Sequence, residues 1–166
     1  MPSFPIAVLL PAGFTLAHAA WSVSDTPPSE LLIPLAIRVV GGQRELLRFE
    51  AETQAAAIEA GKAKGAAWTR DSTPWAFARE GLIRENGTEV DVLSVDFWAP
   101  SMERPATIIQ RFRRYTVDGR FHLLGRMQIS VGGKTLPDSA ADMAIEAIEQ
   151  GVGQHSRVAP LWETWT

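Results

Sequence analysis

Residues 75–98, WAFAREGLIRENGTEVDVLSVDFW, decide the fold, because two alternating segments flank the dipeptide Asn86-Gly87. An Asn-Gly pair between alternating apolar and polar residues is a strong signal for a β-hairpin, since a two-residue type I′ turn needs positive φ at both central positions. Three similar dipeptides, Gly41-Gly42, Asp118-Gly119 and Gly132-Gly133, separate other alternating segments. The sequence therefore predicts an antiparallel sheet built from consecutive hairpins.

The register around Asn86-Gly87 places Trp75 opposite Trp98 and Phe77 opposite Asp96. Side chains alternate across a strand, so these residues share one face of the sheet. Aromatic and charged side chains together are typical of a binding surface. The candidate binding face comprises Trp75, Phe77, Arg79, Asp96 and Trp98 of this hairpin with Arg111, Arg113 and His122 of a later one.

Two other hairpins follow from Gly41-Gly42 and Asp118-Gly119, and Gly132-Gly133 turns the chain back into a short segment over residues 134–136. Gly41-Gly42 joins residues 31–40 to 43–50 and places Arg38 opposite Glu45, an opposite-charge pair that stabilises a sheet. Asp118-Gly119 joins residues 107–117 to 120–131.

In that later hairpin, a two-residue turn places Tyr115 opposite His122 and Arg111 near Arg126. Two facing arginines are destabilising unless an anion lies between them.

Alanine content predicts a helix over residues 52–67, and a second helix begins at Ser139, with Asp142 in a capping-box position. The first helix has a stripe of small residues suited to close packing on the sheet, namely Ala56, Ala60, Ala63 and Ala67 beside Ala57, Gly61 and Gly65. The N-terminal residues 6–10 and 14–23, joined by Pro11-Ala12-Gly13, are interpreted as two short strands.

This order of elements lacks a βαβ rhythm. The prediction is an α+β fold, one globular domain over residues 1–166, in which two α-helices pack on one face of the antiparallel sheet. Four tryptophans, Trp75, Trp98, Trp162 and Trp165, are expected to be exposed, whereas Trp21 and Trp68 are expected in the core.

Composition limits the partners. The chain has no cysteine and a net charge of −3, which favours a protein partner or a homo-oligomer over nucleic acid. Residues 4–16 are mostly apolar, but they lack a basic start and are interrupted by prolines; this segment is too short to cross a membrane. We expect a cytoplasmic protein that binds no membrane, the alternative being export with residues 1–19 as an atypical signal.

No motif in the sequence points to chemistry. The three histidines, His18, His122 and His155, lack metal-ligand spacing, and nucleophile and phosphate-loop motifs are missing. The sequence predicts no catalytic residue, metal or cofactor. The favoured function is that of a non-enzymatic interaction protein, of the inhibitor, immunity, adaptor or assembly-subunit type, and whether the chain is an enzyme stays open.

The alternative is an enzyme that binds a small molecule between the sheet and the alanine-rich helix. Its polar groups would be Arg79, Asp91, Asp96 and His122.

Overall fold

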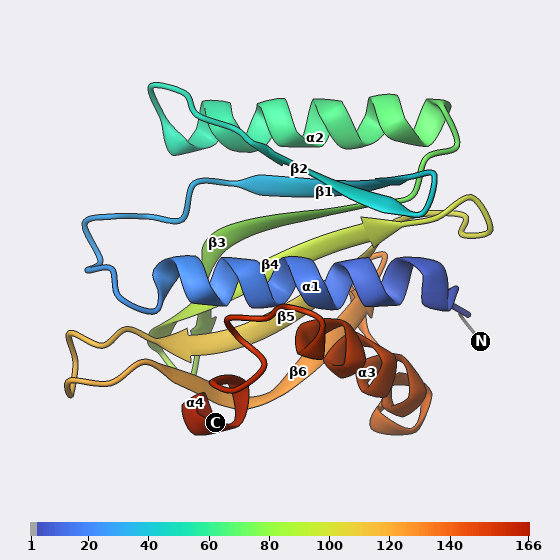
Figure 1. Ribbon diagram of the computed structural model, residues 1–166. Coiled ribbons are helices and arrows are strands. Elements are labelled where there is room, and N and C mark those ends of the chain that lie inside the picture. Colours follow the sequence, from blue (N-terminus) through green and yellow to red (C-terminus); the bar gives the residue numbers. More distant parts are fainter. Residues whose placement is uncertain (1–2) are drawn as a thin grey trace.

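The computed structural model describes residues 3–166, which form a seven-stranded antiparallel sheet with helices packed on it (Figure 1). The strand order is β2-β1-β3-β4-β5-β6-β7, so most neighbours are consecutive in the chain. The α+β class is confirmed. The elements are α1 (Ile6–Val23), β1 (Leu35–Val40), β2 (Gln43–Arg48), α2 (Gln54–Arg70), β3 (Trp75–Glu85), β4 (Thr88–Trp98), β5 (Ala106–Arg113), β6 (His122–Val131), β7 (Lys134–Thr135), α3 (Asp138–Gly153) and α4 (Trp162–Trp165).

The turn dipeptides set the register of two hairpins as predicted. Trp75 pairs with Trp98 along β3 and β4, and both Asn86 and Gly87 have positive φ, 50° and 78°. In the β1–β2 hairpin Arg38 pairs with Glu45, and its Nε lies 2.6 Å from the Glu45 carboxylate. A two-residue turn thus places every side chain of these strands on its expected face.

The β5–β6 hairpin differs from the prediction. Ile109 pairs with Gln128, as expected, but a bulge follows and Arg111 then pairs with Leu124. The bulge lies beside Gly125, whose φ is 72° and whose carbonyl accepts a hydrogen bond from the Gln110 side chain. Between the bulge and the turn, each β5 residue therefore pairs with a β6 residue two positions earlier than predicted.

Because of this shift, Arg113 rather than Tyr115 lies opposite His122. The predicted Arg111–Arg126 approach is also wrong, since Arg126 pairs with Asp142 of α3.

The N-terminal region is a helix, and the prediction of two strands over residues 6–10 and 14–23 is wrong. Pro5 is the N-cap residue, where its missing N–H costs nothing. Pro11 lies inside the helix and its carbonyl accepts a hydrogen bond from the Thr15 hydroxyl at 2.7 Å. The prolines therefore do not break this segment into strands.

Helix α1 is the one helix of the described residues that is long and apolar enough to cross a membrane, with 18 residues and a mean hydropathy of 1.6. The expectation that the segment is too short is therefore wrong. Core helices and signal sequences have the same length and composition, and 61% of this helix is buried within the fold. Here α1 packs on β1, β3 and β4 and contacts α3 (Figure 1).

Helices α1 and α3 touch through their backbones. A Cβ atom on Gly13 of α1 would overlap the carbonyl of Ile148, and a Cβ on Gly151 of α3 would overlap the carbonyl of Leu10. Reciprocal glycines thus allow the two helices to cross without intervening side chains. The two helices cover the sheet face that carries four fully buried residues, Leu93, Val95, Phe97 and Ile108. We call this side of the sheet the helical face.

Helix α2 packs on the other face of the sheet. Gly61 lies against the ring of Phe77, Gly65 lies against Trp75, and Trp68 is buried beside them. Two helices do share one face, as predicted, but they are α1 and α3. The expected stripe is also displaced, because Ala57, Gly61 and Gly65 face the sheet while Ala56, Ala60 and Ala63 are exposed.

The C-terminal elements close the helical face. Pro137 is the N-cap residue of α3, and no side chain of the described residues caps the helix, so the predicted Ser139–Asp142 capping box is wrong. Trp165 of α4 is buried with its ring edge on Phe121, at a centroid distance of 5.0 Å. Its predicted exposure is therefore wrong, and Trp162 is partly buried.

Gly13→Ala should destabilise the fold by about 3 kcal/mol, the upper end for overpacking, because the added methyl meets backbone that cannot rotate away. Gly153→Ala is the matched control, since a Cβ there meets nothing within 4 Å. Urea unfolding measures both. Equal stability of the two variants would contradict the backbone contact between α1 and α3.

Candidate functional site

All eight residues of the candidate binding face lie on the face opposite α1, as the registers of β3 to β6 require. Three of them are not available at the surface. Phe77 is 1% exposed and Trp75 7% exposed beneath α2, while Trp98 is 6% exposed and donates its indole N–H to the carbonyl of Met102. The predicted exposure of these tryptophans is therefore wrong.

The remaining predicted residues lie beyond α2, on the part of this face formed by β3 to β6, which we call the open face. Asp96 accepts hydrogen bonds from Arg79 at 2.8 Å and from Thr107 at 2.7 Å. Arg111 forms a two-point ion pair with Glu85 at the hairpin end. The hydrogen bonds from Arg111 lower the pKa of the Glu85 carboxyl.

The last two predicted residues meet at one edge of the open face. Asp118 lies 3.0 Å from the Arg113 guanidinium and 3.1 Å from Nε2 of His122. Each arginine of the open face that the sequence singled out therefore has a carboxylate partner.

The polar groups of the alternative enzyme hypothesis do not converge. Asp91 lies on the helical side of the sheet, 3.6 Å from Arg114, whereas Asp96 lies on the open face. Arg114 forms a buried two-point pair with Glu80, and Glu80 also accepts the backbone N–H of Leu32. Burial raises the pKa of Asp91. This cluster attaches the loop before β1 to the sheet.

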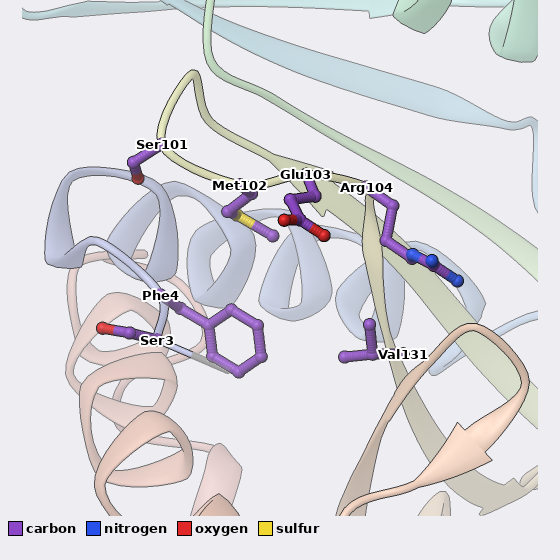
Figure 2. A pocket seen from close by; sticks show the side chains of 7 residues that line it. All are labelled: Ser3, Phe4, Ser101, Met102, Glu103, Arg104 and Val131. Carbon is purple, nitrogen blue, oxygen red and sulfur yellow. The ribbon is translucent and has the colours of Figure 1, made fainter. Parts of the chain in front are cut away.

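A pocket of about 380 Å³ lies between the N-terminal segment and the β4–β5 connection. Figure 2 shows Phe4, Met102 and Val131 on its apolar side and the side chains of Glu103 and Arg104 beside them. The ring of Phe4 packs edge-on against Phe97. The pocket contains no histidine and none of the predicted site residues, so it offers no set of converging catalytic groups.

A second cluster joins α1 to the end of α3. His18 Nδ1 lies 3.1 Å from His155 Nε2, a hydrogen bond between two imidazoles. His155 lies between two aromatic rings, with centroid distances of 4.9 Å to Phe14 and 6.0 Å to Trp21.

Arginines cap both of these rings. Arg44 lies over Phe14 with its Cζ 3.8 Å from the ring centroid, and Arg157 lies over Trp21 at 5.4 Å. Arg48 follows Arg44 on the same face of β2 and acts electrostatically on His18. The histidine–arginine cluster consists of His18, His155, Arg44, Arg48 and Arg157.

Both histidines of this cluster resist protonation. Burial, then the charges of His155 and Arg48, lower the pKa of His18 to about 4. Burial also lowers the pKa of His155, with Arg44 and Arg157 acting in the same direction. At neutral pH the imidazoles are therefore uncharged, and the charge of the cluster comes from its arginines.

The sequence did not reveal this cluster. His18 and His155 are 137 positions apart, and the sequence predicts a strand rather than a helix at His18. Only the crossing of α1 and α3 brings them together. The described residues contain no group of three or more metal-ligating side chains, so the cluster lacks the ligands of a metal site.

Comparison with family models, with curated proteins and with solved structures finds no match to this chain. Function must therefore be inferred from its surfaces and side-chain clusters.

The lowered pKa of His18 should make the folded protein less stable in mild acid. The unfolded chain protonates His18 near pH 6.5 and the folded chain near pH 4, so stability is present above pH 6.5 and is lost as the pH falls toward 4. With allowance for solvent screening, the free energy of unfolding should fall by about 1 kcal/mol between pH 7 and 5. The double variant His18→Gln/His155→Gln should lack this decrease. Urea titrations at each pH test it, and parallel curves for both proteins would exclude this role for the pair.

Proposed function

We propose that this chain is a non-enzymatic binding protein whose open face engages a protein partner. The observation that carries the proposal is a set of half-buried aliphatic side chains on that face, beyond the reach of α2. These residues are Ile83, Val90, Ile109 and Leu124.

The polar side chains around this aliphatic group support a protein as the ligand. Arg79 is paired with Asp96 and Arg111 with Glu85, so the face is close to neutral and lacks the free positive charge that a nucleic acid requires. Apolar residues framed by arginine and other polar groups are typical of protein interfaces. None of the pockets described for residues 3–166 is lined by these four charged residues, which favours a broad ligand over a small molecule.

The charged side chains are held before binding. Arg79, Asp96 and Arg111 have side chains only 23%, 17% and 19% exposed, and each is fixed by hydrogen bonds. A fixed side chain loses less conformational entropy when a partner docks. Inhibitor, immunity, adaptor and assembly-subunit roles all use such a surface. The cytoplasmic location stays a prediction.

Photo-crosslinking tests the proposal in the cells that make the protein. A photoreactive phenylalanine analogue in place of Ile109 should give one defined crosslinked product, and the same analogue in place of the exposed Lys62 of α2 should give none. The mass of the product distinguishes another protein from a second copy of this chain. No product from position 109, or the same products from both positions, would exclude the open face as a binding surface.

Charge reversal supplies an affinity measurement once the product is identified. Arg111→Glu should weaken binding at least tenfold, about 1.4 kcal/mol, because it places two acids side by side at the interface. Arg84→Glu is the matched control, since Arg84 is also paired with a glutamate but lies 69% exposed at the hairpin end. Equal affinities of the two variants would contradict the assigned face.

A further inference from the structure

The histidine–arginine cluster carries positive charge without compensation. Arg44, Arg48 and Arg157 form no salt bridge within 4.0 Å among the described residues, whereas Arg79, Arg111 and Arg114 each have a carboxylate partner. The chain has a net charge of −3, yet three guanidinium groups lie around one histidine pair. Such a local excess of positive charge favours the binding of an anion.

The histidine pair adds an unused hydrogen-bond donor. His18 Nε2 and His155 Nδ1 are buried and have no hydrogen-bond partner within residues 3–166, while the other two ring nitrogens bond to each other. In a neutral pair one imidazole donates to the other, so in either tautomer one of the two unpartnered nitrogens carries a hydrogen and the other does not. A buried donor without an acceptor destabilises the fold, and an anion oxygen would supply the missing acceptor. Both candidate nitrogens are buried, and His155 as a whole is only 6% exposed, so in either tautomer the donor lies beneath the surface of the cluster.

A groove adjoins the cluster. It has a volume of about 690 Å³, its apolar wall includes Leu10, Pro11 and Val39, and Arg44 and Gln154 line it as well. The Arg44 guanidinium donates to the Gln154 side chain at 3.1 Å, and Gln154 directly precedes His155. Space for an apolar group therefore lies next to Arg44, the member of the cluster that lines the groove.

We propose that the histidine–arginine cluster binds the phosphate group of a small phosphate monoester whose apolar organic part lies in this groove. The arginines approach from two segments, β2 and the chain after α3, so they suit an anion with several oxygens. A phosphate dianion offers three free oxygens and close to two charges, whereas a carboxylate offers two oxygens and one charge. The site is separate from the open face, and its test is independent of the protein partner.

Titration with phenyl phosphate at pH 7.5, followed by the imidazole ¹⁵N signals, tests the assignment. We expect saturable shifts of the His18 and His155 signals, with a dissociation constant of about 1 mM or lower and no shift at His122. Inorganic phosphate should bind the same signals at least tenfold more weakly, because it leaves the groove empty. Benzoate, with one charge and a carboxylate, should also bind at least tenfold more weakly.

Arginine variants connect the signal to the cluster. Arg44→Gln and Arg157→Gln should each weaken phenyl phosphate binding at least tenfold while the folded spectrum persists, because both side chains are exposed. Arg70→Gln is the matched control, an exposed arginine at the end of α2 that likewise forms no salt bridge in the part of the chain that the structure describes.

Three results would overturn the proposal. These are no saturable shift with phenyl phosphate, equal affinity for benzoate, and an effect of Arg70→Gln equal to that of Arg44→Gln. Inorganic phosphate that binds as tightly as phenyl phosphate would overturn the assignment of the groove to the ester.

Discussion

The backbone contact between α1 and α3 is the constraint on which the rest of the structure depends. Helix α1 carries no charged residue and is almost entirely apolar, so it requires cover on nearly every side. The sheet covers one side and α3 covers another, and Gly13 and Gly151 allow the second approach at backbone distance. Dispersion and burial act at full strength only at such close range, which makes this crossing the centre of the helical face.

This crossing also separates the two candidate surfaces. Helices α1 and α3 cover the helical face, whereas the predicted site residues Arg79, Asp96 and Arg111 lie on the opposite side of the sheet. The same crossing aligns His18 with His155 and places both next to the arginines of β2. Thus one packing contact leaves a neutral, ion-paired surface on one side and gathers unpaired positive charge on the other. We therefore infer two kinds of ligand for the two sides.

Local signals predicted a large part of the sheet. Positive φ at Asn86 and Gly87 is a property of the turn itself, and pairing then follows residue by residue along two long strands. The register of the β5–β6 hairpin could not be predicted in this way, because a bulge lies beside Gly125 within a strand. A bulge has no dipeptide signal in the sequence. The predicted pairs on the far side of the bulge from the turn are correct, and those between the bulge and the turn are wrong.

Helix α1 and the histidine–arginine cluster could not be predicted in the same way. A continuous apolar segment has no periodicity with which to distinguish a buried helix from a strand, and Pro5 and Pro11 favour interruptions that the helix does not have. The burial of Trp75 depends on which face α2 covers, and small residues on several sides of that helix leave its orientation open. The burial of Trp98 accompanies its hydrogen bond to the carbonyl of Met102 in the β4–β5 connection. Contacts between α1 and the end of α3 are tertiary, so no local pattern contains them.

Native-state hydrogen exchange of the α1 amides tests the central claim most directly. A helix buried between the sheet and α3 should exchange only when the whole domain unfolds, so its amides should be as protected as those of β3 and β4. Exchange of α1 at the rate of an unfolded segment, with β3 and β4 still protected, would contradict the account. In that case α1 would be a detachable segment, and neither the helix crossing nor the histidine pair would exist in solution.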